Sequence, residues 1–162
     1  MNNIVHLRYY GEEVAALVTE IPHKQHTMCK VTLESGYSNI FFTDVESGEW
    51  VEEDLGFTFL AALVGKEMDA IHRRIVHVPK QLTWHTLFNN GKSLHFGFVN
   101  FMNGEQKMFE VYHSNKRYLF TLLQLSHEDW QVLGDDHLEI DQLDTMYIDQ
   151  LIKVLPYYTY QG

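Results

Sequence analysis

Two histidines and the one cysteine of this 162-residue chain fall close together, as His23, His26 and Cys29. Imidazole and thiolate groups at this H-x2-H-x2-C spacing are ligands that Zn²⁺ accepts. A structural zinc site takes four ligands, however, and no second cluster in the sequence completes the set. Cys29 also alternates in phase with Val31 and Leu33, as a packing cysteine on a buried strand face would. We therefore expect neither a metal site nor a cofactor.

Motifs that would name a reaction do not occur in the sequence. It has no Gly-rich phosphate loop, no G-x-S-x-G elbow and no H-E-x-x-H. A nucleophilic role for Cys29 would require a lowered pKa and a base nearby. Asp54, Asp135 and Asp136 could be catalytic carboxylates, but each stands at the start of a predicted helix, where N-capping explains it. Catalytic activity stays open, and a non-catalytic protein is favoured.

Four polar residues interrupt the apolar register of the predicted strands: Asp44, His95, Tyr112 and His113. If the two halves of the chain enclose a cleft, these side chains are the candidates to line it. Clefts of this kind are the usual place for a small-molecule site. A small-molecule-binding protein or an enzyme with a site between the halves is therefore one alternative function.

Hydrophobic periodicity predicts the elements that would position these residues. In the first half, period-2 alternation predicts strands at 4–10, 13–21, 27–34 and 39–45 and a short strand from Trp50. Gly11 lies in the first predicted hairpin turn. A helix follows, with Asp54 as its predicted N-cap. Its apolar residues fall at spacings of three and four: Leu60, Leu63, Val64, Met68 and Ile71.

The second half repeats this order. Strands are predicted at 83–88, 92–101, 106–113, 118–125 and 130–133. The closing helix covers 135–155, capped by Asp135 or Asp136 and ended by Pro156. Strands followed by a single helix in each half predict the α+β class.

An internal repeat would explain why the order recurs. The stretches 31–50 and 111–130 both begin with valine and end with tryptophan, 80 positions apart. Sliding the whole chain by 80 gives eight identical pairs among 82, too few to establish a repeat by identity. The kinds of residue that coincide carry more weight, such as Gly11 with Gly91 in hairpin turns and Trp50 with Trp130.

Strand register supports the repeat more strongly than identity does, because a one-residue slip reverses every side chain of a strand. We predict two tandem pseudo-repeats, residues 1–78 and 79–162. Each is an antiparallel β-meander of four to five strands followed by one helix, and the two pack in a saddle-like or face-to-face arrangement. The alternative, that any two meanders followed by a helix look alike, stays open. Trp50 and Trp130 are expected to cover the junction between sheet and helix.

The fourth strand of each half carries apolar side chains on both faces. A sheet with water on one face would alternate cleanly, so a second covered face is indicated. The residues predicted to form this binding face are Phe41, Thr43, Val45, Thr121, Leu123 and Leu125. The leading hypothesis is a non-catalytic binding or assembly module that uses this face for a protein partner or for self-association as a homodimer.

Charge limits the class of partner. The chain carries a formal net charge of −10, and residues 118–152 contain eight acidic residues and no lysine or arginine. Nucleic-acid binding needs clustered basic residues and is disfavoured. The acidic stretch could instead occupy a basic partner, although a solvated helix face explains it more simply. No apolar run approaches the roughly 20 residues of a membrane span. A single cysteine and the absence of a secretory signal pattern favour a cytoplasmic protein.

Overall fold

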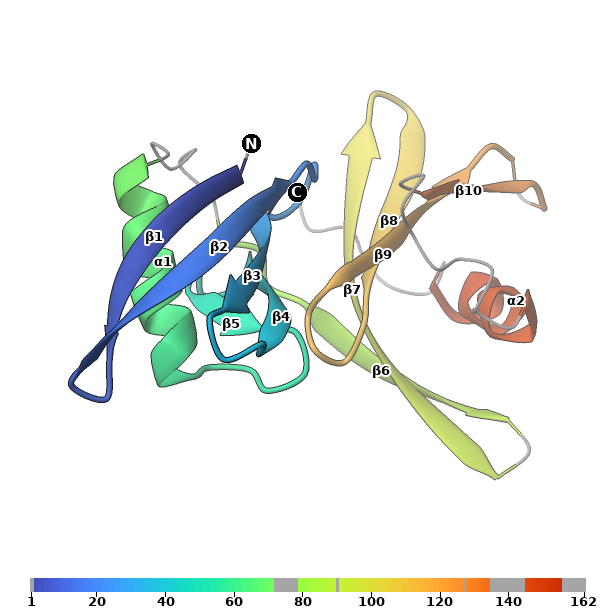
Figure 1. Cartoon of the computed structure of the whole chain (residues 1–162). Helices are drawn as coiled ribbons and strands as arrows, with labels where there is room; N and C mark the ends of the chain where they lie inside the picture. Colours follow the sequence, from blue (N-terminus) through green and yellow to red (C-terminus); the bar gives the residue numbers. More distant parts are fainter. Residues whose placement is uncertain (1, 72–78, 90, 127, 135–144, 156–162) are drawn as a thin grey trace. The chain divides into compact units, whose positions relative to one another are not determined.

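The computed structural model describes residues 2–71, 79–89, 91–126, 128–134 and 145–155 (Figure 1). The chain forms two compact units, Met1–Lys80 and Gln81–Gly162, here called unit 1 and unit 2. In its described residues, each unit contains one antiparallel five-stranded sheet and one helix. The predicted α+β class is confirmed, with sheet as the dominant element.

Unit 1 is an up-and-down meander followed by a helix. Its elements are β1 (Asn2–Tyr9), β2 (Glu12–Ile21), β3 (Met28–Leu33), β4 (Ser38–Thr43), β5 (Trp50–Glu52) and α1 (Phe59–Ile71). The sheet order is β1-β2-β3-β4-β5, so each strand pairs with its neighbours in sequence. Tyr10 and Gly11 form the β1–β2 turn with φ of 51° and 79°. Positive φ at both central residues is the backbone of the twisted two-residue hairpin turn.

The core of unit 1 lies between the sheet and α1, which contacts both edge strands, β1 and β5. Alternate residues of each strand supply it. The core residues are Val5, Leu7, Ala16, Val18, Cys29, Val31, Leu33, Phe41, Trp50, Leu60, Ala61, Val64 and Met68. The predicted packing role of Cys29 is confirmed, since its side chain is fully buried there. A smaller cluster of Met28, Phe42 and Val51 lies on the opposite face of the sheet.

Helix α1 begins later than predicted, and its cap is Thr58 rather than Asp54. The Thr58 hydroxyl accepts a hydrogen bond from the Ala61 backbone N–H at 3.0 Å, and its carbonyl accepts from Ala62 N–H at 3.1 Å. Residues 52–56 instead form a turn, in which Gly56 N–H donates to the Glu52 carbonyl. Both residue types are good caps, and this turn decides between them.

Trp50 joins the sheet of unit 1 to its helix, as predicted. Its indole packs on Gly65 of α1, where any Cβ atom would overlap the Cδ1 and Cγ atoms of the ring. The indole Nε1 donates a hydrogen bond to Asp69 Oδ1 at 3.2 Å. Trp130 is only half-buried; it packs on the core of unit 2, with its ring 5.8 Å from that of Phe109.

Unit 2 has the same sequence of elements. They are β6 (Thr83–Asn89), β7 (Lys92–Asn103), β8 (Gln106–Tyr112), β9 (Tyr118–Gln124), β10 (Trp130–Gly134) and α2 (Thr145–Val154). The sheet order is β10-β9-β8-β7-β6, again a meander. The core comprises Leu87, Phe96, Phe98, Phe109, Val111, Phe120, Leu122, Leu151 and Leu155. The predicted caps Asp135 and Asp136, and the predicted first turns of this helix, lie outside the described residues.

The pairing registers of the two sheets agree in the first three strands and then differ by one residue. Ile21 pairs with Met28 in unit 1, and Phe101 pairs with Met108 in unit 2. A β-bulge follows in unit 2: Tyr112 pairs with Tyr118 and Val111 with Phe120, so that Leu119 is an extra residue. A bulge of this kind reverses the faces of all residues beyond it.

The bulge corrects the predicted equivalence of the two fourth strands. Cys29 pairs with Phe41 in unit 1, whereas Phe109 pairs with Leu122 in unit 2. An offset of 80 would match Phe41 with Thr121, but the pairing matches it with Leu122. The next turn has six residues in unit 1 (44–49) and five in unit 2 (125–129), which restores the offset at the two tryptophans.

Candidate functional site

Unit 1 contains a cavity of about 460 Å³ beside the start of α1. We call it the aromatic pocket, because four aromatic residues line it. Its lining residues are Tyr9, Tyr10, Leu33, Ser35, Tyr37, Glu52, Leu55, Thr58, Phe59 and Leu60. The volume is within the range of small-ligand sites, and the mixture of apolar walls with few polar groups is typical of them.

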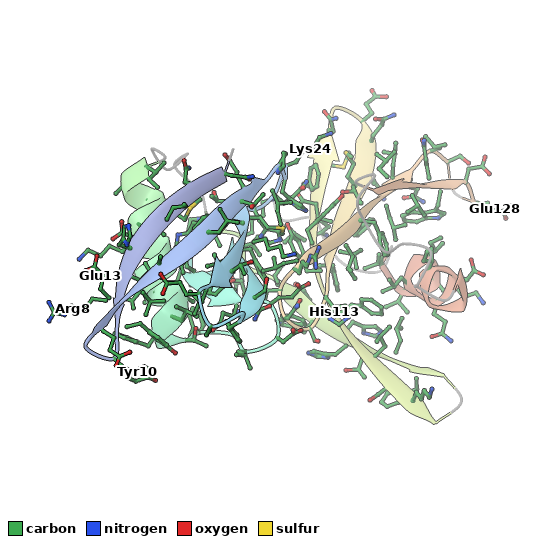
Figure 2. All side chains as sticks on the ribbon, viewed as in Figure 1. Arg8, Tyr10, Glu13, Lys24, His113 and Glu128 are labelled. Carbon is green, nitrogen blue, oxygen red and sulfur yellow. The ribbon has the colours of Figure 1, made fainter. Side chains whose placement is uncertain are left out.

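Turns and element ends present the four rings. Tyr9 ends β1, and Tyr10 follows it in the hairpin turn, at the tip labelled in Figure 2. Phe59 is the first residue of α1, and its ring centroid lies 6.1 Å from those of both Tyr9 and Tyr10. Tyr37 lies in the β3–β4 turn. Tyr10 is 77% exposed and Phe59 56% exposed, so aromatic surface is available to a ligand at the mouth of the pocket.

The carboxylate of Glu52 is the charged group of the pocket. Its strand register aligns it with Trp50, so it points toward α1 and is only 2% exposed. Oε1 accepts hydrogen bonds from the Tyr37 hydroxyl at 2.5 Å and from Asn39 Nδ2 at 3.2 Å. Oε2 accepts from the Thr58 hydroxyl at 2.5 Å. The cap of α1 thus also holds this carboxylate.

All three donors to Glu52 are neutral, and no lysine, arginine or histidine among the described residues forms an ion pair with it. Glu52 contributes to the raised pKa values of two neighbouring tyrosines, Tyr37 and Tyr9. The hydrogen bond to Glu52 is the largest cause that raises the pKa of Tyr37, followed by burial. Partial burial raises the pKa of Tyr9, and Tyr10 and the charge of Glu52 add to the rise. A buried charge is least costly when it is both hydrogen-bonded and paired with an opposite charge, and Glu52 has the hydrogen bonds without a basic partner among the described residues.

A second cavity, of about 500 Å³, shares Thr58 with the aromatic pocket in its lining. Trp50, Ala62 and Gly65 form part of its lining, and Glu49, Lys66 and Asp69 supply charges of both signs. The Asp69 carboxylate already accepts from the Trp50 indole. This cavity offers no charged group as deeply buried as Glu52, which makes the aromatic pocket the stronger candidate.

The six residues of the predicted binding face do not lie on equivalent faces of the two sheets. Phe41 lies in the core beneath α1, which corrects its assignment to an outward face. Thr43 shares that face, and its hydroxyl accepts from the Thr27 backbone N–H. Val45 is buried after the end of β4, and its carbonyl accepts from Lys80 N–H.

On β9 the residues that face the core of unit 2 are Phe120 and Leu122, which are not members of the predicted binding face. Thr121 and Leu123 therefore point to the opposite face of the sheet. Leu125 follows β9 in a turn and is 56% exposed. The bulge at Leu119 is the physical reason that equivalent sequence positions face opposite ways.

Each of the four predicted cleft residues has a local structural role. Asp44 organises the β4–β5 turn, where its Oδ1 accepts from Glu46 N–H at 2.9 Å. His95 stacks on Trp84, with ring centroids 4.8 Å apart. The remaining two are adjacent at the end of β8: the buried Tyr112 hydroxyl donates to Glu110 Oε2 at 2.5 Å, and His113 Nδ1 lies 3.1 Å from Ser114 Oγ in the turn labelled in Figure 2.

The H-x2-H-x2-C residues do not converge on one point: the rings of His23 and His26 lie 5.0 Å apart, but Cys29 does not join them. His23 Nδ1 accepts from the backbone N–H of Gln25 and His26, and His26 Nδ1 lies 2.9 Å from the Thr43 carbonyl oxygen. Cys29 is in the core beneath α1. Within the described part of the chain, no three His, Cys, Asp or Glu side chains gather in a way that could hold a metal ion.

Sequence reasoning missed the aromatic pocket. Its one detectable signal is Glu52, an acidic residue two positions from Trp50 in a strand and therefore on the same, core-facing side. The four rings come from the β1–β2 hairpin, the β3–β4 turn and the start of α1, and sequence spacing does not bring them together.

Comparisons with known proteins give no family or relative: no protein-family model, no curated protein and no solved structure matches the chain significantly. Among the described residues, no helix has the length and apolar character to cross a membrane.

Proposed function

We propose that the protein is a non-catalytic binding module, and that the aromatic pocket of unit 1 binds a ligand carrying a positive charge. The observation that supports this is the Glu52 carboxylate, 2% exposed and without a basic partner among the described residues, beside four aromatic rings. A cation in the pocket would neutralise this carboxylate. The face of each ring would attract it as well, because the π-system presents negative potential.

The electrostatics of the site favour a cation. In a partly desolvated pocket the attraction between a carboxylate and a cation is several times stronger than in water. The formal net charge of −10 adds a field that raises the local concentration of cations and repels anions.

Binding rather than catalysis is the role that the pocket chemistry supports. Glu52 already accepts three hydrogen bonds, which occupy most of its acceptor sites. The only serine of the pocket, Ser35, has no histidine beside it among the lining residues. A nucleophile with its activating base is the arrangement that covalent catalysis needs.

We also propose that units 1 and 2 are tandem pseudo-repeats. Both sheets have the same strand order, and both hold equivalent registers through three strands. The β3–β4 and β8–β9 turns share their hydrogen bonds: Leu33 N–H donates to Tyr37 O and His113 N–H donates to Arg117 O, each at 2.8 Å. An experimental structure whose units superpose with an offset of 80 up to Tyr118 would support the duplication, and unrelated strand paths would remove it.

Unit 2 then provides an internal comparison for the pocket. Phe41 pairs with Glu52 in unit 1, and the equivalent pair in unit 2 is Leu122 with Val132. Arg117 occupies the turn position of Tyr37. A meander of this type thus forms with valine in place of the buried glutamate. The scaffold does not require Glu52, which favours a ligand-binding role for it.

Amide chemical-shift titrations test the proposed function. Tetramethylammonium, arginine ethyl ester and acetate would be added to the labelled full chain and to the variants Glu52→Gln and Glu53→Gln. We expect at least one cation to shift the amides of Tyr10, Tyr37 and Phe59, acetate to shift none, and Glu52→Gln to abolish the response. Glu53→Gln, the neighbouring acid, keeps it. If neither cation perturbs the pocket, or if the response survives in Glu52→Gln, the proposal fails.

A further inference from the structure

We infer that the aromatic pocket selects a fully methylated ammonium group over a primary ammonium or a guanidinium. This inference rests on the proposed function and specifies the ligand class of the same site. The headgroup could belong to a free choline-like molecule or to a trimethylated lysine of a polypeptide, since both present the same chemistry to the pocket.

The first argument comes from the hydrogen-bonding capacity of Glu52. A primary ammonium carries three N–H donors and is strongly hydrated, so entry into a pocket requires acceptors that replace its water. The Glu52 oxygens already accept from Tyr37, Asn39 and Thr58. With only 2% of the residue exposed, its carboxylate acts on a ligand through its charge rather than through direct contact. A quaternary ammonium has no N–H donor to satisfy and therefore loses less on entering.

The second argument comes from the rings. Tyr9, Tyr10 and Phe59 form one wall, with centroids 4.5 to 6.1 Å apart. Tyr37 lines the pocket as well, with its hydroxyl committed to Glu52. Methyl groups pack on such surfaces while their positive charge is attracted to the ring faces, which is the usual way in which proteins recognise quaternary ammonium ions.

The third argument comes from size. At about 460 Å³ the pocket is larger than a trimethylammonium group, and Leu33, Leu55 and Leu60 supply apolar surface beyond the rings. A headgroup with an aliphatic stem would cover this surface, as the stem of a lysine or the chain of a choline ester does. A bare inorganic cation would leave it in contact with water.

Isothermal titration calorimetry on the full chain can test this selectivity. The probes are choline, its neutral carbon isostere 3,3-dimethylbutanol, and a short peptide containing either trimethyl-lysine or unmodified lysine, with arginine ethyl ester as the guanidinium. We expect a trimethylammonium probe to bind roughly tenfold or more tightly than lysine and arginine, the order of a desolvated cation–π preference. Choline binding alone identifies a small-molecule ligand, and binding of the trimethylated peptide alone identifies a polypeptide.

Two variants separate the causes of selectivity. Phe59→Leu keeps an apolar side chain but removes a ring, and it should reduce trimethylammonium binding severalfold while the thermal midpoint changes little. Phe57→Leu, the same change at an exposed ring outside the aromatic pocket, is the matched control and should leave binding and headgroup selectivity intact. Equal or tighter binding of lysine or arginine overturns this inference and leaves the proposed function standing. Equal binding of the neutral isostere, or no binding of any cation, overturns both.

Discussion

The indole ring of Trp50 occupies the space that a Cβ atom on Gly65 would need, and its Nε1 donates to Asp69 one turn further along α1. A glycine inside a helix costs about 1 kcal/mol relative to alanine. In α1 the absence of a Cβ atom at Gly65 allows the sheet and the helix to approach closely at Trp50.

Replacing Gly65 by alanine should therefore destabilise unit 1 despite the better helix propensity of alanine. We expect Gly65→Ala to lower the free energy of unfolding by about 1–3 kcal/mol, the usual cost of overpacking. Urea unfolding measures it. In a Trp50→Leu background the same change should become neutral or stabilising. A stabilised Gly65→Ala single variant would contradict the packing seen here.

Thr58 should be the residue on which the start of α1 depends. Thr58→Ala removes the cap of Ala61 N–H and one donor to Glu52, so we expect a loss of about 1–2 kcal/mol in chemical unfolding. Asp54→Ala, at the cap position predicted from the sequence, is the matched control and should have almost no effect. Equal effects of both changes would indicate that the helix begins elsewhere.

Tyrosine ionisation should report the charge of Glu52. The pKa of Tyr37 is raised above its usual 10.0, mainly by its hydrogen bond to Glu52. The folded state holds this proton more tightly than the unfolded chain, so its contribution to stability is present below about pH 10 and is lost as the pH rises further. Glu52→Gln should lower the pKa of Tyr37. Ultraviolet titration of wild type, Tyr37→Phe and Glu52→Gln measures it, and unchanged curves in Glu52→Gln would contradict the contact.

Cys29 should resist thiol reagents until the protein unfolds. Burial, and secondarily the charge of Glu20, raises its pKa from 9.0 to about 12. Between these values the unfolded thiol ionises and the folded one does not, so stability falls as the pH rises. The stability difference between wild type and Cys29→Ala should shrink over this interval, because the variant lacks the titration. Rapid labelling of the native protein at neutral pH would contradict the burial.

The turns at Gly36 and Lys116 should respond to opposite substitutions. Both residues have left-handed backbone, with φ of 91° and 68°, and both N–H groups donate to the carbonyl three residues earlier at 2.9 Å. This conformation costs a non-glycine residue roughly 1 kcal/mol or more. We expect Gly36→Lys to destabilise by about that amount and Lys116→Gly to be neutral or stabilising, as measured by urea unfolding. Loss of stability in Lys116→Gly would argue against equivalent turns.

Strand positions could be predicted from the sequence because alternation and turn residues are local signals. The predicted boundaries of β1 to β10 agree with the structure to within a few residues, and Gly11 lies in its hairpin turn as expected. The identity of the helix cap could not be predicted, because Asp54 and Thr58 are both good caps and a turn that neither residue reveals decides between them.

The faces of β9 and the candidate site were beyond sequence reasoning for different reasons. A bulge adds one residue to a strand, but no residue type marks it in the sequence. Leu119 therefore cannot be distinguished from an ordinary strand residue. The aromatic pocket depends on contacts between a hairpin turn, a second turn and a helix start. Glu52 reads as one of three consecutive acids in the sequence, and only its pairing with Phe41 shows that it points inward.

If the two units are copies of one module, as we propose, the extra residue at Leu119 has an evolutionary consequence. One insertion there, compensated by a deletion in the following turn, exchanges the inner and outer side chains of β9 while the tryptophans keep their spacing. The second copy acquires a new exterior through these two length changes, without a substitution at every position of the strand. Divergence of the two copies toward separate tasks is then possible while both retain one architecture.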